Sequence, residues 1–302
     1  MSSSPEPSGA GVDFFARGAL PVPRVTIADA ERVASSFGLT VRAQPLGSQQ
    51  DSNFLLADEG RVLGVLKIAN PAFSAAEIEA QDGAAAHIAA ACPDLRVATA
   101  THAPVAVPVD GGPVDGGPVD GGRALARVLR YLPGGTLAGA GRYLSPRVVA
   151  GLGTVAGQVS LALSTFDHPG LDRVLQWDLR HALRLVHALA GHVRDTGLRA
   201  RVTDAAGAAW SRVEPLAGRL PWQAVHGDVT DDNVVCRLER GLRTPDGIID
   251  FGDLTSSWAV GELAVAITSV LRHAGAEPCS VLPAVRAFHG LRPLSAEEAA
   301  VL

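Results

Sequence analysis

The amino-acid sequence predicts an α+β fold of two lobes, a small antiparallel-sheet lobe followed by a larger helical lobe. Between residues 39 and 132, apolar residues occur in short runs separated by turn residues, which is typical of hairpin-connected strands. From Ser145 onward, apolar residues recur at the i, i+3 and i+4 spacing of helices. With 302 residues, the chain is long enough for two domains or for one two-lobed unit. We therefore expect a disordered tail and lead-in over residues 1–24, a first lobe over 25–132 and a second lobe over 133–302.

The composition excludes several classes of protein. Hydrophobic residues make up 47% and charged residues 19% of the chain, which is enough to bury a core. The net charge of −5 argues against a non-specific nucleic-acid binder. Cys92, Cys236 and Cys279 lie far apart, which indicates neither a disulfide framework nor a zinc site. The sequence contains no run of about 18 apolar residues, so we expect no membrane span. Residues 1–11 lack the regions of a secretory signal, so we expect a cytoplasmic protein.

The first lobe is expected to begin with a helix and to continue with strands joined by polar loops. Thr26 is typical of a helix cap, and Gly38 is a stop signal after the helical pattern ends at Phe37. Strands are expected over residues 39–45, 53–57, 62–68, 97–107 and 124–132. The loop 47–53 is small and polar, and by its pattern alone it is an ordinary hairpin loop.

Lys67 lies inside an apolar strand, where an ammonium group needs a partner. The helix that follows is expected over residues 74–91, because Ser74 and Glu77 match a capping box. The alternative is that Lys67 extends from a strand edge into solvent.

The segment 108–122 repeats Pro-Val-Asp-Gly-Gly three times. Pro and Gly at this density do not bury a core, so we expect a solvent-exposed extension of a hairpin. Asp110, Asp115 and Asp120 lack the spacing of a calcium-binding loop.

The second lobe is predicted to be mostly helical. Ser145 and Pro146 are typical of a cap followed by Pro at the first helical position. Ser295 and Glu298 match a second capping box near the end of the chain. Helices are expected over residues 148–166, 177–193, 203–217, 261–273, 281–289 and from 295 to the end.

The strongest functional signals lie in the segment 225–253. His226, Asp228 and Asn233 reproduce the spacing H-x-D-x-x-x-x-N, which is typical of the catalytic loops of phosphoryl-transfer enzymes. Residues 250–252 reproduce the D-F-G that follows such a loop. An Asp-rich surface turn beside a buried strand is the alternative interpretation.

Two short apolar strands are expected between these motifs, over residues 233–236 and 247–249, with a turn at 245–247. Such a hairpin brings Asn233 and Asp250 towards one point. The carboxylate of Asp250 and the amide oxygen of Asn233 suit Mg²⁺, which prefers hard oxygen ligands. Asp228 is suited to orient an attacking hydroxyl and to take its proton.

These motifs resemble those of the aminoglycoside phosphotransferase and choline kinase group, small-molecule kinases with a protein-kinase-like fold. The closer resemblance is to hydroxylysine-kinase-like phosphotransferases, some of which are fused to a class III aminotransferase. The resemblance extends over roughly residues 25–291 and includes the segments 47–54, 65–68 and 175–179. Because the family continues with further helices, the short helix that ends at Leu302 predicts a truncated domain.

The resemblance implies roles for residues outside the central segment. It implies that the loop containing Ser48 and Gln49 closes over the nucleotide phosphates, which Lys67 also holds. It implies that Tyr131 and Leu132 form the hinge whose backbone reads the purine.

The resemblance also implies which residues pair with Lys67 and which hold the catalytic loop in place. The sequence has Gln81 where the family has the glutamate that pairs with the lysine, and Glu77, one turn earlier, is a substitute. His226 is expected to pack the catalytic loop, and Asp253 to bond its backbone or a metal-bound water.

The resemblance therefore implies an enzyme that uses Mg²⁺ and transfers the γ-phosphoryl group of ATP or GTP to a hydroxyl of an amino alcohol or hydroxylated amino acid. The expected partners are the nucleotide and a small hydroxylated amine, with neither nucleic acid nor membrane. Two alternatives stay open. One is an aminoglycoside O-phosphotransferase. The other is a catalytically weak module that regulates a fused or separate aminotransferase. Gln81 and the short C-terminal end favour this module, whereas the intact Asp228, Asn233 and Asp250 argue against it.

Overall fold

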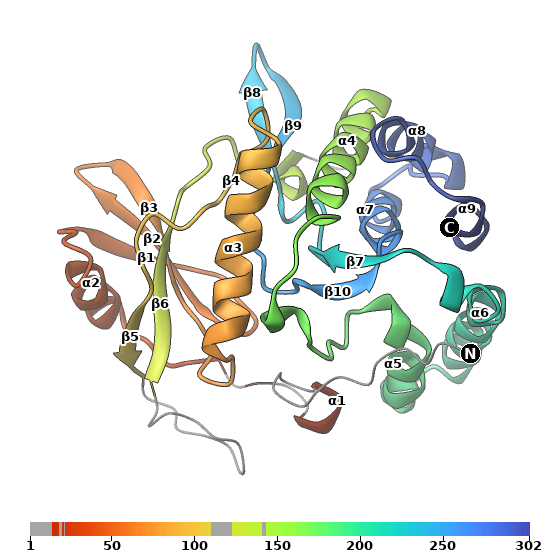
Figure 1. Ribbon diagram of the computed structural model, residues 1–302, viewed down its shortest axis with the longest axis horizontal. Helices are drawn as coiled ribbons and strands as arrows, with labels where there is room; N and C mark the ends of the chain where they lie inside the picture. The colour runs from red at the N-terminus through yellow and green to blue at the C-terminus, as the bar shows by residue number, and fades with distance from the viewer. Residues whose placement is uncertain (1–13, 18–19, 21, 110–122, 141–142) are drawn as a thin grey trace.

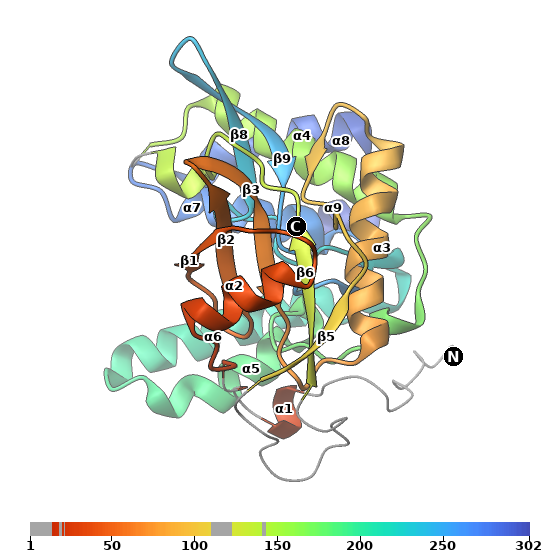
Figure 2. The same ribbon diagram turned by 90° about the vertical axis from the view of Figure 1, so that its left-hand side faces the viewer.

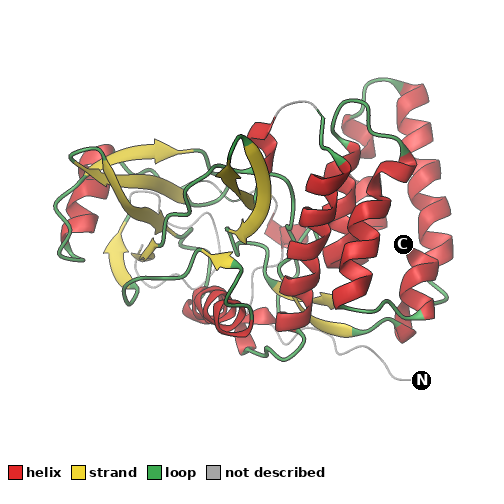
Figure 3. Ribbon diagram, turned by 90° about the horizontal axis from the view of Figure 1, so that it is seen from above, coloured by secondary structure: helices red, strands yellow, loops and turns green. Residues whose placement is uncertain are grey.

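The computed structural model describes residues 14–17, 20, 22–109, 123–140 and 143–302. Strands gather at one end of the molecule and most helices at the other, which gives two lobes (Figure 3). Within these ranges, none of the helices is long and apolar enough to cross a bilayer.

The first lobe is built on a five-stranded antiparallel sheet. In spatial order its strands are β1 (Arg42–Leu46), β2 (Ser52–Asp58), β3 (Arg61–Ile68), β6 (Arg123–Leu129) and β5 (Val105–Pro108). The register places Lys67 of β3 opposite Asn53 of β2 and Arg127 of β6. The sheet therefore fixes the predicted phosphate-binding lysine between two neighbouring strands.

A helix, α2 (Ile27–Ser35), covers the outer face of this sheet (Figure 2). Thr26 caps it as predicted, since its side chain accepts a hydrogen bond from the backbone N–H of Asp29. Ala30 and Ala34 of the helix pack in one core cluster with Phe54, Leu56 and apolar residues of β3, β5 and β6.

A second helix, α3 (Ala75–Ala91), lies between the sheet and the helices of the second lobe (Figure 1). Ser74 and Glu77 form the predicted capping box. Its apolar face belongs to the large core cluster of the second lobe, where Ala84 and Ile88 lie with Leu152 and Val155 of α4 (Pro146–Leu163).

The strand expected over residues 97–107 is wrong as a single element. The chain forms β4 (Arg96–Val97), leaves it, and forms β5 only at Val105. β4 pairs in parallel with a strand of the second lobe, whereas β5 pairs with β6 in the first. One run of apolar residues thus contributes strands to two different sheets. Local strand propensity does not predict such a division, because it depends on tertiary pairing.

The second lobe is a helical assembly around α4. Its remaining helices are α5 (Ala182–Leu189), α6 (Thr196–Val213), α7 (Gly261–Leu271), α8 (Leu282–Leu291) and α9 (Ala296–Val301). A short helix, α1 (Phe14–Arg17), packs near Leu175. A side chain at Gly153 would place its Cβ 2.2 Å from the carbonyl oxygen of Ala284, so glycine allows α4 and α8 to approach closely.

The helix expected over residues 177–193 is also wrong in extent. The α-helical part is only Ala182–Leu189, with 3₁₀ turns on both sides. Asp178 caps the first 3₁₀ turn through the backbone N–H of Arg180, which stops an α-helix from starting at Trp177. The next helix, α6, starts earlier than expected because Asp195 caps it.

Two small sheets carry the central segment. β7 (Trp222–Val225) pairs with β10 (Thr255–Trp258), and β8 (Val234–Glu239) forms a hairpin with β9 (Leu242–Ile248). The hairpin was predicted, but the prediction that its turn lies at residues 245–247 is wrong. Arg240 and Gly241, with φ of 50° and 78°, form the turn instead.

Tertiary pairing explains this displaced turn. Pro245 lies opposite Cys236 at a register shift, on a part of β9 that β4 does not reach. Pro is tolerated at such an edge because no ladder hydrogen bond is lost there. Arg96 donates to the neighbouring Asp246 and holds it in the strand.

Two predictions fall on parts of the chain outside the described residues. These are residues 1–13, 18, 19 and 21 of the expected tail and lead-in, and most of the Pro-Val-Asp-Gly-Gly repeats, from residue 110 to 122. Disorder was also expected over residues 14–17, and that is wrong, because they form α1 with Phe14 buried. The strands that flank the repeats, β5 and β6, are an antiparallel pair.

Candidate active site

A cleft of about 700 Å³ lies between the two lobes and collects most of the predicted site residues. The first lobe contributes the loop after β1 and Lys67, and the second lobe contributes the catalytic loop and the D-F-G segment. The lining residues are Gly47, Ser48, Gln49, Gln50, Asp51, Lys67, Trp177, Gly227, Asp228, Thr230, Asp232, Asn233, Asp250, Gly252, Asp253, Val265 and Arg272.

Lys67 is held between two carboxylates. Its Nζ lies 2.7 Å from Oδ1 of Asp250 and 3.0 Å from Oδ2 of Asp51. Only 6% of its side chain is exposed, and burial by itself lowers the pKa of an ammonium group. The two carboxylates outweigh burial and raise the pKa of Lys67 above its ordinary value, so the side chain stays charged.

Asp250 is strained and charged. Its φ of 59° is rare for a residue other than glycine, and such strain concentrates at functional sites. The neighbouring Lys67 ammonium lowers the pKa of Asp250 to about 2. Its Oδ1 also accepts a hydrogen bond from the backbone N–H of Gly252 at 3.1 Å. The side chain is nevertheless 43% exposed, so a carboxylate oxygen remains open to the cleft.

Asp228 and Asn233 are bonded to each other across the catalytic loop. Nδ2 of Asn233 donates to Oδ2 of Asp228 at 2.6 Å and to its backbone carbonyl at 3.0 Å. Because Nδ2 makes both of these bonds, the amide oxygen of Asn233 is the atom available as a ligand. Burial raises the pKa of the Asp228 carboxyl, which makes it a stronger base than a free aspartate.

His226 is a buried, neutral support of this loop. Its Nδ1 accepts from the backbone N–H of Asp228, which leaves Nε2 to donate to the carbonyl of Ile249 at 3.1 Å. Burial lowers the pKa of His226 to about 4, in agreement with a single proton on the ring. The ring packs on Phe251 with centroids 4.7 Å apart. His226 thus connects the catalytic loop to the D-F-G segment.

Glu262, at the start of α7, anchors the same loop and was not predicted from the sequence. Its side chain is fully buried and accepts from the backbone N–H groups of His226 and Gly227. Burial raises the pKa of Glu262 to about 8. Gly227 has φ of 81°, and a Cβ there would lie 2.7 Å from the carbonyl oxygen of Asp253. Glycine is therefore required where the two loops cross.

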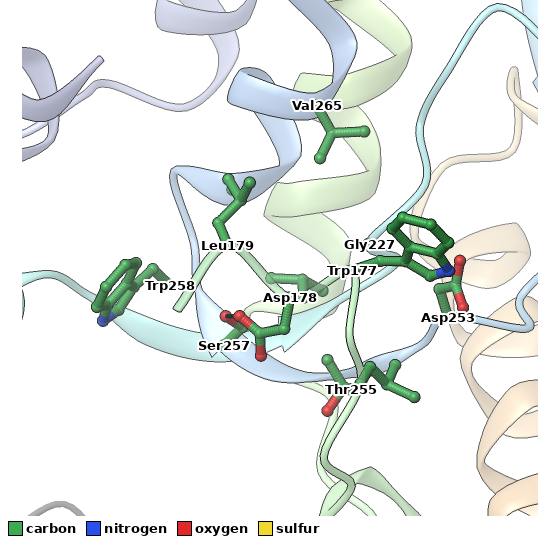
Figure 4. A pocket seen from close by; sticks show the side chains of 12 residues that line it. Trp177, Asp178, Leu179, Gly227, Asp253, Thr255, Ser257, Trp258 and Val265 are labelled. Atoms are coloured by element: carbon green, nitrogen blue, oxygen red, sulfur yellow. Dashed lines mark hydrogen bonds between the residues drawn. The ribbon is translucent and has the colours of Figure 1, made fainter. Parts of the chain in front are cut away.

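Asp253 lies beside the catalytic loop, where burial and the charges of Asp228 and Asp250 raise its pKa to about 6. It also lines a second, small pocket of about 20 Å³ together with Trp177, Leu179 and Trp258 (Figure 4). This pocket is large enough for one water molecule at most, so only the larger cleft of the two can hold a larger ligand.

The prediction that Lys67 pairs with a residue of α3 is wrong. Glu77 does not pair with Lys67. Its Oε1 lies 2.8 Å from Nε of Arg173. Gln81 accepts from Nη2 of Arg127 at 2.8 Å, so it does not bond the lysine either. Asp51 takes that place from the loop before β2.

Sequence reasoning missed Asp51 and Arg127, although both carried a signal. Asp51 ends the polar loop that resembles the family's phosphate loop, and Arg127 interrupts an apolar strand opposite Lys67. Arg127 is buried between Gln81 and Asp82, whose carboxylate it binds at 2.7 Å.

The predicted nucleotide-binding residues lie in two places. Ser48 and Gln49 line the cleft, and the Ser48 hydroxyl accepts from the backbone N–H of Asp51. Tyr131 and Leu132 follow β6 in the connection between the lobes, and their side chains are not part of the cleft wall. Leu132 is buried against Ala98 and Val235.

The residues around Asp250 fit a Mg²⁺ ion. Over the described ranges, no three His, Cys, Asp or Glu side chains gather into a metal cage. Mg²⁺ is nonetheless commonly bound by one or two protein oxygens together with substrate phosphates and water. Asn233 and Asp250 supply one amide oxygen and one ionised carboxylate to the same cleft.

Comparisons with known proteins identify the family and the fold of the chain. A model of the phosphotransferase enzyme family, APH, matches residues 42–292. The chain is 28% identical over 257 residues to hydroxylysine kinase from Mus musculus, a match that covers 78% of this chain. The chain spans 66% of the length of that relative.

Solved structures share the fold at low sequence identity. An amicoumacin kinase in complex with AMP-PNP, Ca²⁺ and Ami has a TM-score of 0.60 at 14% identity, covering 88% of this chain and 79% of that one. A microcompartment-associated aminopropanol kinase has a TM-score of 0.57 at 16% identity, covering 92% and 84%. The predicted two-lobed, kinase-like fold is thereby confirmed, and the chain belongs to the phosphotransferase enzyme family.

Proposed function

We propose that this chain is a small-molecule kinase that transfers the γ-phosphoryl group of ATP or GTP to a hydroxyl of an amino alcohol or hydroxylated amino acid. The observation that carries the proposal is one cleft that gathers the Lys67–Asp250 ion pair with the bonded pair Asp228 and Asn233. The relatives named hydroxylysine kinase and aminopropanol kinase support the class of acceptor.

The first-lobe residues are assigned to the nucleotide. Lys67 binds its phosphates, and the loop containing Ser48 and Gln49 lies over them. Asp51 shares the lysine with Asp250 at 3.0 Å and so keeps it charged and in place. Asn233 and Asp250 hold Mg²⁺, which neutralises phosphate charge when it is bound.

Asp228 is assigned as the base. Its carboxylate accepts the acceptor's hydroxyl proton while the hydroxyl oxygen bonds to phosphorus and the nucleoside diphosphate leaves. The bond from Asn233 fixes the orientation of the carboxylate. The raised pKa of Asp228 brings its proton affinity closer to what this transfer needs.

The charge of the cleft supports an acceptor that carries an ammonium group. Asp228, Asp232 and Asp253 face the cleft around the catalytic loop. Carboxylates within several ångströms of a bound cation attract it and repel an acidic acceptor.

The test is a coupled assay of ADP and GDP release over amino alcohols, hydroxylated amino acids and aminoglycosides, with Asp228→Asn as the matched inactive control. We expect Mg²⁺-dependent turnover with a small hydroxylated amine that the Asp228→Asn variant loses. Turnover with aminoglycosides alone would replace the proposed acceptor. Nucleotide-dependent thermal stabilisation without turnover on any of these compounds would overturn the proposal in favour of a non-catalytic module.

A further inference from the structure

Arg272 brings a positive charge to an otherwise acidic part of the cleft. It caps the C-terminus of α7, a position where the helix dipole favours a cation. It lines the cleft together with Trp177 and Val265, and 57% of its side chain is exposed. The residue is therefore anchored at the wall of the site and open to a bound molecule.

Arg272 is held in place through one edge of its guanidinium group. Its Nη2 donates to Oδ1 of the buried Asp231 and lies 3.7 Å from Oδ2 of Asp232. Asp231 is fixed in turn by Nε2 of His273 at 2.8 Å. Both ion pairs found for Arg272 among the described residues use Nη2, so the N–H groups on Nη1 and Nε stay available for a further acceptor.

Among the charged residues that line the cleft, Arg272 differs from Lys67 in its availability to the acceptor. Lys67 already faces two carboxylates, Asp51 and Asp250, and is assigned to the nucleotide. Around the catalytic loop, the other charged lining residues are Asp228, Asp232 and Asp253. An acceptor with only an ammonium group is served by these carboxylates and leaves Arg272 unused. An acceptor that also carries a carboxylate uses both signs of charge, since a guanidinium fork matches a carboxylate.

We infer that Arg272 binds a carboxylate of the acceptor, and that the acceptor is therefore a hydroxylated amino acid and not an amino alcohol without a carboxylate. This inference rests on the proposed function. A charge-assisted hydrogen bond of this kind corresponds to about 10- to 100-fold in kcat/KM between acceptors with and without the carboxylate.

The test compares acceptors that differ only by the carboxylate. Suitable pairs are hydroxylysine and its decarboxylated diamine, threonine and 1-amino-2-propanol, and serine and ethanolamine. For each pair, kcat/KM is measured on the wild type, on Arg272→Gln and on Arg272→Lys. Arg201→Gln, at an exposed arginine of α6 outside the cleft lining, is the matched control.

We expect the wild type and the Arg201→Gln control to prefer the carboxylate-bearing member of the pair that is turned over. Arg272→Gln should reduce that preference by about 10-fold or more, with partial recovery in Arg272→Lys. Both acceptors are measured on the same protein, so a general loss of folded enzyme cancels in the ratio. If Arg272→Gln does not fold, the primary amide of the amino acid on the wild type supplies the same contrast, with a similar loss expected.

Two outcomes overturn the inference while the proposed kinase function stands. One is a wild type that prefers the decarboxylated member, or a preference that Arg272→Gln leaves unchanged. The other is an equal loss on both members with a raised KM for the nucleotide, which would assign Arg272 to the phosphates. Absence of turnover on every pair contradicts the proposed function itself and the inference with it.

Discussion

Glu77 and Arg173 form a buried ion pair that connects α3 to the D-F-G segment. Nε of Arg173 lies 2.8 Å from Oε1 of Glu77 without hydrogen-bond alignment, so the attraction is chiefly Coulombic. The side chains are 1% and 2% exposed. Nη1 of the same arginine donates to the carbonyls of Gly252 and Leu254 at 2.8 and 3.0 Å. The loop that carries Asp250 and Asp253 is therefore positioned from a helix far away in the sequence.

This pair predicts a large loss of stability when one charge is removed. Glu77→Gln keeps the shape of the side chain and leaves the Arg173 guanidinium buried without its counter-charge. We expect the free energy of unfolding to fall by about 3–5 kcal/mol in urea unfolding. Glu297→Gln is the matched control, because its ion pair with Arg219 is long and partly exposed and should contribute at most about 1 kcal/mol. Equal effects in the two variants would contradict the prediction.

Lys67→Ala is expected to weaken nucleotide binding and to leave unfolding cooperative. The ammonium group is charged and lies between Asp51 and Asp250, and its loss removes a charged donor for the phosphates. The dissociation constant should rise about 10- to 100-fold, the usual effect of a charged hydrogen bond. Calorimetric titration with a non-hydrolysable nucleotide measures it, and Arg61→Ala, on the exposed end of the same strand, is the control. An unchanged dissociation constant would show that Lys67 does not bind the nucleotide.

Asp228→Asn and Asp250→Asn are expected to fail in different ways. Asp228→Asn keeps the shape of the catalytic loop and removes the base, so kcat should drop by about 10²–10⁴ while the nucleotide and Mg²⁺ still bind. Asp250→Asn removes a charge from the metal ligands and from Lys67, so Mg²⁺-dependent binding and turnover should fall together.

Calorimetry of nucleotide binding at several Mg²⁺ concentrations, beside steady-state turnover, separates these two results. If Asp228→Asn loses nucleotide binding while Asp250→Asn keeps it, the two assignments are reversed.

The buried Glu262 predicts a pH-dependent stability. Its pKa is raised from 4.5 to about 8 in the folded chain. Between these pH values the folded state holds a proton that the unfolded state has lost. The contribution of Glu262 is therefore complete below pH 4.5 and is lost as the pH rises through 8, with a slope of at most about 1.4 kcal/mol per pH unit.

Urea unfolding of the wild type and of Glu262→Gln, from about pH 5 to pH 8, measures this contribution. Gln keeps an acceptor oxygen for the backbone N–H of His226 and does not titrate. The stability of the wild type should fall relative to that of the variant as the pH rises. Parallel profiles would show that folding does not raise the pKa of Glu262.

The sequence predicted best what is decided locally. Capping residues such as Thr26, Ser74 and Ser145 begin the helices that they predicted, because a cap satisfies backbone groups within three residues. The spacing of Asp228 and Asn233 likewise placed both in one loop, bonded to each other. The kinase-like fold and the family membership followed from these motifs and are confirmed.

Long-range choices were not predictable in the same way. The partner of Glu77 is Arg173, almost a hundred residues later, and nothing in the local sequence of α3 selects it over Lys67. The turn signal around Pro245 is a strong local pattern, but pairing with β8, the pairing of Gly247 with β4 and the bond from Arg96 to Asp246 keep that segment in a strand. The acceptor, the choice between ATP and GTP and the relation to an aminotransferase stay predictions.

The placement of α3 in the core of the second lobe has a mechanical consequence. Because α3 packs on α4 and β4 is paired with β9, the five-stranded sheet with α2 forms a core separate from that of α3 and the second lobe. Arg127 with Asp82 and Gln81, and Lys67 with Asp250, connect the sheet to α3 and to the D-F-G segment. Any movement of the sheet away from the second lobe therefore has to break the ion pair between Lys67 and Asp250.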